Sequence, residues 1–515
     1  MTDRTPVVVG VGQCSERLDD PGYRALSPVE LGAEAARRAL ADTGADPAAV
    51  AARVDLVAAV RQFEMSAPGA QAPLGRSDNY PRSVAARIGA DPRRAVLEVV
   101  GGQSPQHLVT EAAGLIAAGE ADVVVLVGAE ALSTVRRLLG SEAGRPDWTE
   151  HVGGQLEDRG LGLESYIVPE QVENDVLTPV LQYALLEHAR RARLGLSRDE
   201  HRREMAELFA PLSAVAARNP HAAAPTARSV DELAAATSDN RPITDPYLRH
   251  LVAREQVNQG AAVVVAGADA ARELGVPDDR WVHLHGHADL VEPPLLERAD
   301  LGASPAAATA VRRALALAGI GVDDLATVDL YSCFPIAVRV VTDELGLAAD
   351  DPRGLTVTGG LPFFGGPGND YSMHAIADTV TALRARPGTF GLVGANGGAI
   401  HKYSAGVYST RAAPWREGDG AAAQAEVDAA HAKAPGTVRR AEGPATVETY
   451  TVEYSRDGTP HGAVVVGRLH EGEHRVLARV ASDDTATLGT FATADPLGST
   501  VIVTPADRGL RVTLA

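Results

Sequence analysis

Cysteine and long apolar runs are both scarce in this chain. Only Cys14 and Cys333 occur in its 515 residues, which excludes a disulfide framework and a zinc site built on cysteine, and which is typical of a reducing compartment. No apolar run approaches the roughly 20 residues that a membrane helix needs. The opening stretch MTDRTPVVVG lacks the basic and apolar regions of a secretion signal. We therefore expect a soluble, cytoplasmic protein that does not bind a membrane.

Basic residues are in the minority. The chain has 67 acidic residues against 48 lysines and arginines, and the formal net charge of -19 is spread along the sequence. This distribution argues against nucleic acid or an anionic membrane surface as a partner. Apolar residues make up 45% of the chain, which is enough to fill the cores of the two or three domains that this length predicts.

The first 130 residues alternate short apolar runs with amphipathic helices, which predicts βαβ units and a mostly parallel sheet. Ser27 and Glu30 form the pattern of a capping box at the start of a helix over 27–44. Residues 133–255 interrupt this alternation with charged helical stretches, and we expect an insertion that covers an edge of the sheet. The expected strands before it span 6–12, 54–63, 94–101 and 122–132.

The alternation resumes near residue 256 and predicts a second half of similar layout. Residues 413–444 are rich in alanine, glycine and charge, and are expected to form a linker. Short β-prone runs beyond residue 444 predict a small all-β domain. The predicted domains are a first half with its insertion over 1–255, a second half over 256–412, the linker, and an additional β-barrel over 445–515.

Two patterns that often bind ligands are weak here. Gly10 and Gly12 follow a strand, but no helix opens at once and no acid follows about 20 residues on at the end of a second strand, so we predict no dinucleotide site. The triplet His283, His285 and His287 alternates along one face of a strand. The alternation alone is a weak sign of a metal site, and we predict none there.

The stretch VVGGQSPQHLV, over 99–109, has the form of a turn between a strand and a helix. In α/β enzymes such a turn often holds a nucleophile against the positive end of the helix. Ser104 is a candidate, but Ser followed by Pro is the ordinary pair at a helix start, and the G-x-S-x-G pattern is missing. We predict that Ser104 caps the helix.

Cys333 lies in VDLYSCFPIAV, at the end of a buried strand, where Pro335 opens a helix. Two interpretations stay open: a thiol whose pKa the helix and its neighbours lower, or a small buried hydrophobic residue. Farther on, GGLPFFGGPGNDYSMHA carries His374 and GANGGAIHKY carries Asn396 and His401. Each glycine-rich turn either brings the backbone close to a ligand or is a plain tight turn.

Taken in this order, these segments resemble the thiolase superfamily over about residues 5–410. The strand ADVVVLVGAEAL, the segments ITDPY and VNQGAAVVVAG, the strand VDLYSCF and the turns GGPG and GANGGA fall where thiolases keep their shared segments. The segments FFGGPGNDYSMHAI and HKYSAGVYST resemble those of the actinobacterial thiolase-like proteins of type 1. The extra C-terminal domain of these proteins is an OB-like barrel. The resemblance implies a five-layered α/β thiolase fold of two similar βαβ halves, followed by a small all-β (OB-like) domain.

The resemblance also implies that two catalytic side chains are missing. Thiolases carry the acyl group on a nucleophilic cysteine that a histidine activates. The block of that cysteine falls on residues 102–105, with glycine at the place of the thiol, and the block of the histidine falls on residues 365–367. The residues of these two turns expected to contact coenzyme A are Gly102, Ser104, Gly365 and Gly366.

Other parts of the thiolase site are retained. Cys333 matches the second, acid/base cysteine, with Tyr331 and Ser332 in place of the usual His and Asp, and the last shared block falls near residues 396–398. His374 lies beyond the lost histidine and could reach the same cavity. Proton transfer by two residues, and an oxyanion held by backbone N–H groups, are thus expected. The expected catalytic residues are Cys333, His374, Asn396 and Gly398.

The first functional hypothesis is an acyltransferase or C–C lyase that acts on a coenzyme A thioester, similar to acetyl-CoA acetyltransferases. Coenzyme A or acyl-CoA is then a substrate, with no covalently bound cofactor and no metal. Cleavage of the retro-Claisen or retro-aldol type needs no acyl-enzyme and so tolerates the loss at Gly102. The alternative is a non-catalytic subunit that binds a coenzyme A ester or acts as a scaffold, with the C-terminal barrel as its docking module for a partner protein. With either function we expect a monomer or a homodimer. Too few Lys and Arg follow residue 444 to favour nucleic acid there.

Overall fold

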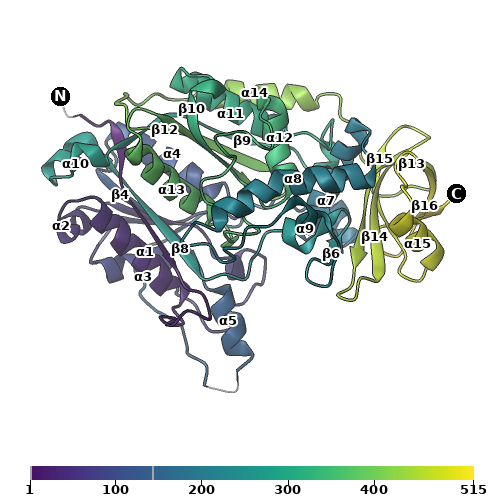
Figure 1. Cartoon of the computed structure of the whole chain (residues 1–515), viewed down its shortest axis with the longest axis horizontal. Helices are drawn as coiled ribbons and strands as arrows, with labels where there is room; N and C mark the ends of the chain where they lie inside the picture. Colours follow the sequence, from purple (N-terminus) through teal and green to yellow (C-terminus); the bar gives the residue numbers. More distant parts are fainter. Residues whose placement is uncertain (1–2, 142–143) are drawn as a thin grey trace.

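The chain is described here by a computed structural model, which covers residues 3–141 and 144–515. Its largest element is a ten-stranded sheet with the order β10-β11-β12-β9-β1-β8-β4-β2-β3-β5 (Figure 1). The strands of this sheet are β1 (Pro6–Ser15), β2 (Leu56–Ala59), β3 (Arg94–Leu97), β4 (Val123–Glu130), β5 (Glu157–Asp158), β8 (Gln259–Gly267), β9 (Val282–Val291), β10 (Leu325–Leu330), β11 (Phe390–Gly397) and β12 (Lys402–Ser409).

The sheet is mixed, so the prediction of a mostly parallel sheet is wrong for its centre. The parallel pairs lie toward its two ends, where β2 runs beside β3 and β4, and β10 beside β11. In the centre β8 lies between β1 and β4, and β12 between β9 and β11, all antiparallel. The cause is clearest at β11 and β12, because the short connection over 398–401 can join only antiparallel strands.

Helices cover the sheet on both sides and also lie between its halves. In the middle layer, α4 (Ser104–Ala118) and α13 (Tyr371–Ala385) contact each other and strands of both halves. On the outer faces, α1 and α3 cover the first half and α11 and α12 the second. The remaining helices of the two halves are α1 (Pro28–Asp42), α2 (Pro47–Ala52), α3 (Tyr80–Ile88), α10 (Ala268–Glu273), α11 (Pro305–Ala318) and α12 (Pro335–Leu345).

The predicted capping box at the start of α1 is confirmed. The hydroxyl of Ser27 accepts the backbone N–H of Glu30, and the carboxylate of Glu30 accepts the backbone N–H of Ser27. These bonds satisfy two N–H groups that the helix itself leaves free.

The insertion is helical and reaches the sheet at one edge, through β5. Its elements are α5 (Leu132–Leu139), α6 (Pro169–Glu173), α7 (Pro179–Leu194), α8 (Arg198–Ala216), α9 (Val230–Ala234), β6 (Pro242–Thr244) and β7 (Tyr247–Leu248). In Figure 1, α5 projects below the body of the molecule, and α7 and α8 lead from the sheet toward the C-terminal domain. Short 3₁₀ helices lie at Phe63–Met65, Arg249–Leu251, Asp278–Arg280, Leu295–Glu297 and Val322–Asp324.

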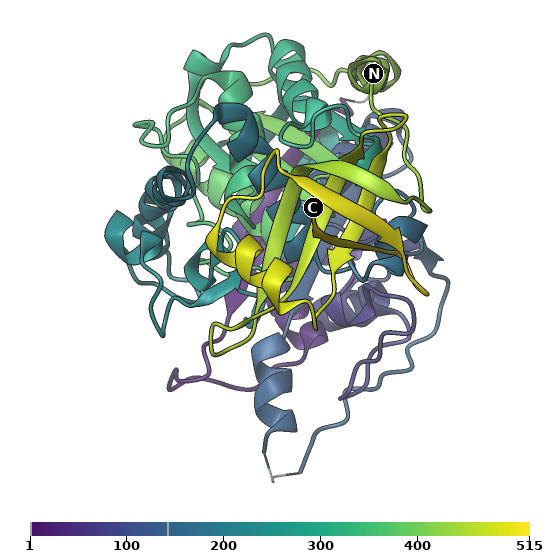
Figure 2. The ribbon, with the colours of Figure 1, turned by 90° about the vertical axis from the view of Figure 1, so that its right-hand side faces the viewer.

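The C-terminal domain is a closed β-barrel, which faces the viewer in Figure 2. Each of its strands pairs with two others in the circuit β13-β14-β15-β17-β16-β13. A core of its own fills the barrel. Its elements are β13 (Gly443–Tyr454), β14 (Pro460–Leu469), β15 (Arg475–Val480), α15 (Thr485–Thr493), β16 (Thr500–Pro505) and β17 (Leu510–Leu514), and α14 (Gly420–His431) precedes it.

The barrel is joined closely to the insertion. Strand β6 pairs with β13 at Thr244 and Glu453. The buried guanidinium of Arg191 on α7 donates to the carboxylate of Asp495, with both N–O distances at 2.7 Å. The barrel is therefore packed against the rest of the chain rather than tethered to it.

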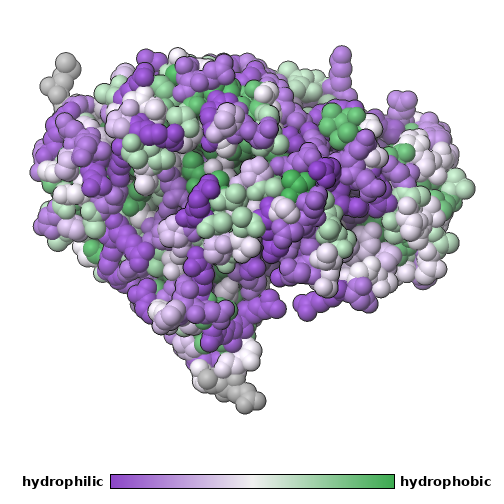
Figure 3. Space-filling view, in the orientation of Figure 1, coloured by the Kyte–Doolittle hydropathy of each residue, from purple (hydrophilic) through white to green (hydrophobic). Residues whose placement is uncertain are grey.

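The surface is largely hydrophilic. Figure 3 shows small apolar patches scattered among polar side chains on the face in view. Among the residues that the structure describes, no helix combines the length and apolar character that crossing a membrane requires.

Candidate active site

A neighbouring side chain occupies the turn between β3 and α4. The carbonyl of Gly102 accepts a hydrogen bond from Ser372 at the start of α13, and the N–H of Gly101 donates to Asn369 Oδ1 at 3.0 Å. A β carbon at Gly102 would overlap the ring and hydroxyl of Tyr331, which follows β10. Tyr331 therefore fills the space that any side chain at Gly102 would need.

Ser104 is the first residue of α4 and not its cap, so this prediction is wrong. The residue before the helix is Gln103, which makes no capping bond with its side chain. The Ser104 hydroxyl donates instead to the carbonyl of Val99 at 3.0 Å and accepts from Gln103 Nε2 at 3.2 Å. These bonds within the turn compete with capping, and they make Ser104 part of the wall that shapes the turn.

Cys333 lies between β10 and the first turn of α12, as the sequence predicts, and is 7% exposed. Burial raises the pKa of its thiol to about 12, although the nearby side chains of Tyr183 and Asn396 favour the thiolate. The first of the two interpretations from the sequence, a thiol with a lowered pKa, is therefore wrong. A thiol of this kind is protonated at neutral pH and can donate a proton, but it is a poor nucleophile.

Three of the predicted catalytic positions, at Cys333, Asn396 and Gly398, come together. The hydroxyl of Tyr183 on α7 lies 2.7 Å from both Asn396 Oδ1 and the carbonyl oxygen of Gly398. Its ring stacks on that of Phe334, with 4.4 Å between centroids. One tyrosine of the insertion thereby fixes the turn between β11 and β12 beside the thiol.

A second tyrosine of the insertion closes the same turn. Tyr166 is 9% exposed and lies edge-on to His401, with 5.1 Å between ring centroids. Its ring also lies close to Gly398, where an added β carbon would come within 3.0 Å of it. Burial, and next the charge that a thiolate at Cys333 would carry, raises the pKa of Tyr166, so its phenol stays protonated.

His374 faces a different set of partners. Its Nδ1 lies 2.7 Å from Gln13 Oε1 on β1, and its Nε2 lies 3.7 Å from Asp370 Oδ2. Burial holds the pKa of His374 well below its usual range, so the ring is neutral. Within the described ranges, none of its hydrogen bonds, ion pairs or ring contacts involves Cys333.

The turn of Gly365 and Gly366 packs against the segment before β8. Gly365 has a φ of 123°, which favours glycine, and the N–H of Gly366 donates to the carbonyl of Arg254 at 2.8 Å. The same segment reaches the candidate site, because the N–H of Ala253 donates to the carbonyl of Cys333 at 3.0 Å. The two predicted turns are thus linked through one backbone segment.

The same segment lines a basic pocket of about 420 Å³, to which Ala253 and Phe363 contribute. Burial and the neighbouring guanidinium groups lower the pKa of Arg254. In a chain with a net charge of -19, this concentration of guanidinium groups is suited to a ligand with several phosphates. The arginines that line the pocket are Arg136, Arg228, Arg241, Arg249 and Arg254.

The histidine row on β9 holds the backbone of the segment after β12. His285 Nε2 lies 2.8 Å from the carbonyl oxygen of Arg411, and His287 Nε2 lies 3.1 Å from that of Arg416. The ring of His287 also stacks on Trp415 at 4.6 Å between centroids. These histidines therefore fasten the start of the predicted linker to the sheet.

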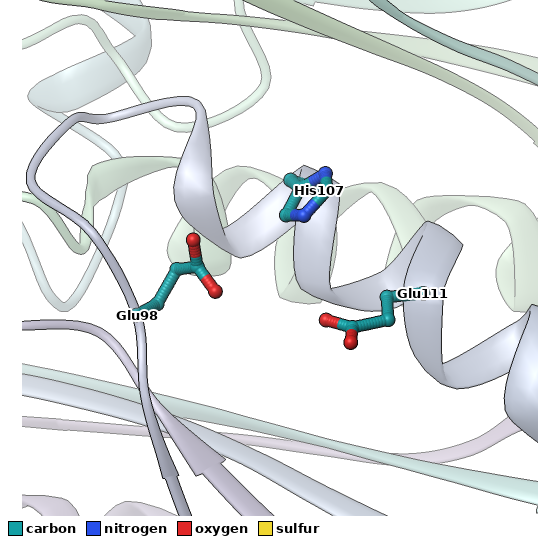
Figure 4. A group of neighbouring side chains, drawn as sticks. All are labelled: Glu98, His107 and Glu111. Atoms are coloured by element: carbon teal, nitrogen blue, oxygen red, sulfur yellow. The ribbon is translucent and has the colours of Figure 1, made fainter. Parts of the chain in front are cut away.

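Figure 4 shows a second cluster of titratable groups, formed by Glu98, His107 and Glu111. Their potential ligand atoms lie within 4.8 Å of one another. Arg159 donates to both carboxylates, at 2.5 Å to Glu98 and at 2.5 and 2.7 Å to Glu111, and His107 lies 3.3 Å from Asp289 Oδ1. Each group already has an oppositely charged partner, so the cluster is an ion-pair network that ties Arg159 to β3 and α4.

Sequence reasoning missed two residues of the site, Tyr166 and Tyr183. Both lie in the insertion, where no recognisable motif surrounds them. The available signal is composition: aromatic residues make up only 4% of the chain, yet several of its tyrosines surround one thiol.

Comparison with known proteins agrees with this architecture. The family described as "Thiolase-like protein type 1 additional C-terminal domain" matches residues 423–508. A solved structure of a monomeric SCP2-thiolase like protein type 1 from Mycobacterium smegmatis is 49% identical over 100% of both chains, with a TM-score of 0.84. No curated protein is significantly similar to the chain.

Two more distant structures show the fold alone. Human mitochondrial 3-ketoacyl-CoA thiolase in complex with CoA is 18% identical over 80% of this chain and 100% of its own, with a TM-score of 0.55. An Ltp2-ChsH2(DUF35) aldolase is 20% identical over 79% of this chain and 98% of its own, with a TM-score of 0.57. The predicted α/β thiolase fold with an additional C-terminal all-β domain is confirmed.

Proposed function

Because the chain belongs to the SCP2-thiolase-like proteins of type 1, we propose that it binds a coenzyme A thioester and acts as a C–C lyase on it. The observation that carries the proposal is the filling of the Gly102 space by Tyr331. An acyltransferase of the thiolase type needs a nucleophile at that place to carry the acyl group. Cleavage of the retro-aldol type has no such requirement.

The retained residues suit this reaction. When the bond between the α and β carbons of a 3-hydroxyacyl thioester breaks, the hydroxyl loses its proton and the β carbon leaves as a carbonyl. The electron pair moves onto the thioester as an enolate, and the protonated thiol of Cys333 supplies a proton to the α carbon. The side chain of Asn396 and the backbone N–H groups near Gly398 would hold the thioester oxygen, and the bonds by which Tyr183 joins the two residues support this assignment.

The basic pocket gives the coenzyme a place to bind. Its arginines would hold the phosphates of coenzyme A, and the pantetheine arm would pass the segment at Ala253, whose N–H bonds to Cys333. The turns of Gly102, Ser104, Gly365 and Gly366 would shape the way in between.

The sequence predicts a proton-transfer role for His374, which in this reaction would be to accept the hydroxyl proton. The contacts of its ring with Gln13 and Asp370 make a structural role the competing explanation. A His374→Gln variant separates the two, because only a proton-transfer role predicts lost turnover in a protein that still folds and binds coenzyme A.

The experiment is to incubate the full chain with 3-hydroxyacyl-CoA esters and to look for the shortened acyl-CoA and the carbonyl product by mass spectrometry. We expect turnover that Cys333→Ala lowers by about a hundredfold or more. Cys14→Ala is the matched control, because Cys14 is the other buried thiol and lies outside the site. Equal turnover rates in the two variants would contradict the assignment of Cys333 as the proton donor.

A second function, binding without catalysis, is favoured by the deep burial of Cys333 and by the filled nucleophile space. Coenzyme A binding measured by calorimetry, together with the absence of turnover across 3-hydroxy and 3-keto esters, would establish it. Loss of both binding and turnover would exclude the two functions together.

A further inference from the structure

We propose that Tyr166 is a further catalytic residue, whose hydroxyl joins the amide of Asn396 in donating hydrogen bonds to the thioester oxygen. The inference rests on the proposed function, since it names the groups that would receive the thioester. It goes beyond the sequence-based assignment, which relies on the retained positions at Asn396 and Gly398.

Two buried donors beside Cys333 lack an oxygen or nitrogen acceptor. Within the described part of the chain, Tyr166 Oη has no hydrogen-bond partner, and Asn396 Nδ2 has none other than the sulfur of Cys333, whose thiolate form it favours. Folded proteins rarely leave such groups unsatisfied, because burial removes their bonds to water. A pair of free donors at one turn indicates a place where an acceptor from a ligand completes the bonding.

The orientation of Asn396 is set by Tyr183. Its Oδ1 accepts from the Tyr183 hydroxyl at 2.7 Å, which leaves the NH₂ end of the amide as the free end. Asn396 is the second-last residue of β11, and the turn that follows this strand carries Gly398 and His401, both of which lie close to the Tyr166 ring. Both donors therefore belong to the surroundings of one turn.

Tyr166 is held there by a segment that we call the strap, residues 157–166. The strap begins as β5 and crosses the turn of Gly102. The N–H of Val100 donates to the carbonyl of Leu161 at 3.0 Å, and Lys402 Nζ donates to the carbonyl of Gly162 at 2.6 Å. Farther back, Arg159 joins the strap to the acidic cluster of Figure 4.

These donors are suited to the charge that the reaction creates. An enolate concentrates negative charge on the thioester oxygen, and donors already fixed in a site that excludes water stabilise that charge without reorganising. A neutral phenol and a neutral amide can both donate to an oxyanion. Because the same two donors can also bond to the carbonyl of an unreacted thioester, the protein should bind a thioester more tightly than an analogue that lacks the carbonyl.

The test compares acetyl-CoA with S-ethyl-CoA, in which a methylene replaces the carbonyl, by titration calorimetry on the full chain. We expect the wild type to prefer the thioester by about tenfold, and Tyr166→Phe to reduce this preference about fivefold while it binds S-ethyl-CoA unchanged. In addition, the carbonyl stretch of bound acetyl-CoA, labelled with ¹³C, should lie at higher frequency in the variant. This readout needs no turnover.

Tyr403→Phe is the matched control, because Tyr403 is another buried tyrosine whose hydroxyl has no partner among the described residues, and it is outside the proposed donor pair. An unchanged preference in Tyr166→Phe, or an equal loss in Tyr403→Phe, would overturn the inference and leave the proposed function standing. If neither ligand binds the wild type, the proposed function fails, and the inference fails with it.

Discussion

Tyr331 and Gly102 are complementary: the phenol ring of the first lies where the side chain of the second would begin. No larger side chain can be placed at residue 102 while the ring stays where it is. The glycine at residue 102 and the bulky aromatic residue after β10 thus depend on each other. This pairing is the reason to look for chemistry without an acyl-enzyme.

Gly102→Ala should destabilise the wild-type chain by about 2 kcal/mol, because one added methyl group overpacks a closed core against Tyr331. In a Tyr331→Ala background the same substitution should cost less than about 0.5 kcal/mol, since neighbouring sites are not additive. Urea unfolding of the four proteins measures the coupling. Gly22→Ala is the control, because a β carbon there meets no atom within 4 Å. Purely additive effects would contradict the pairing.

Alkylation of Cys333 should accelerate about tenfold for each pH unit between pH 7 and 9, without reaching a plateau. The reason is the raised pKa of this thiol, about 12, since only the thiolate reacts. Iodoacetamide labelling followed by mass spectrometry in a Cys14→Ala background isolates the one thiol. A plateau inside that range would mean that the thiol is activated, and would return it to the role of a nucleophile.

The ion pair of His107 and Asp289 should make stability depend on alkaline pH. Burial by itself would lower the pKa of His107, but Asp289 and the nearby glutamates raise it to about 9. Because the folded pKa lies above the unfolded value, the contribution is complete below about pH 6.5 and is lost as the pH rises through 9. Since the imidazole is partly exposed, we expect a loss of only about 1 kcal/mol.

Asp289→Asn separates this effect from the titration of other groups. Urea unfolding midpoints between pH 6.5 and 9.5 should fall less in this variant than in the wild type. Parallel curves for the two proteins would show that His107 is not the group responsible.

Arg254→Gln should weaken the binding of coenzyme A by about tenfold and leave pantetheine binding unchanged, because pantetheine lacks the phosphates that the basic pocket would hold. Calorimetry with both ligands makes the distinction. Arg386→Gln serves as control, since Arg386 is exposed at the end of α13. A tenfold loss of affinity for both ligands would show that Arg254 does not act through the phosphates.

Local signals along the chain predicted the local features of the structure. Ser27 and Glu30 are three residues apart, and their reciprocal bonds need only that spacing. Ser104 carries an equally familiar signal, but a bond to the carbonyl of Val99, five residues away across the turn, decides its role. The prediction failed because this bond within the turn competes with the cap.

Long-range contacts limited how much of the site could be predicted from the sequence. The sequence pointed to Cys333, which follows β10, and to Asn396, near the end of β11, because recognisable motifs surround both residues. It gave no sign of Tyr183, whose hydroxyl meets Asn396 across 213 positions of sequence. Such contacts depend on how the insertion packs over the sheet, which no local periodicity encodes.

The two residues of β5 also affect how copies of the protein meet. Strand β3 would otherwise end the sheet with free backbone groups, but Glu157 and Asp158 of the same chain pair with it. Both side chains are exposed and negatively charged. A second copy that tried to extend the sheet here would have to displace this pairing, together with the ion pairs of Glu157 with Arg94 and of Asp158 with Arg61. A segment of two residues thus prevents other copies of the protein from adding strands to this edge of the sheet, even at the high protein concentrations of a cell.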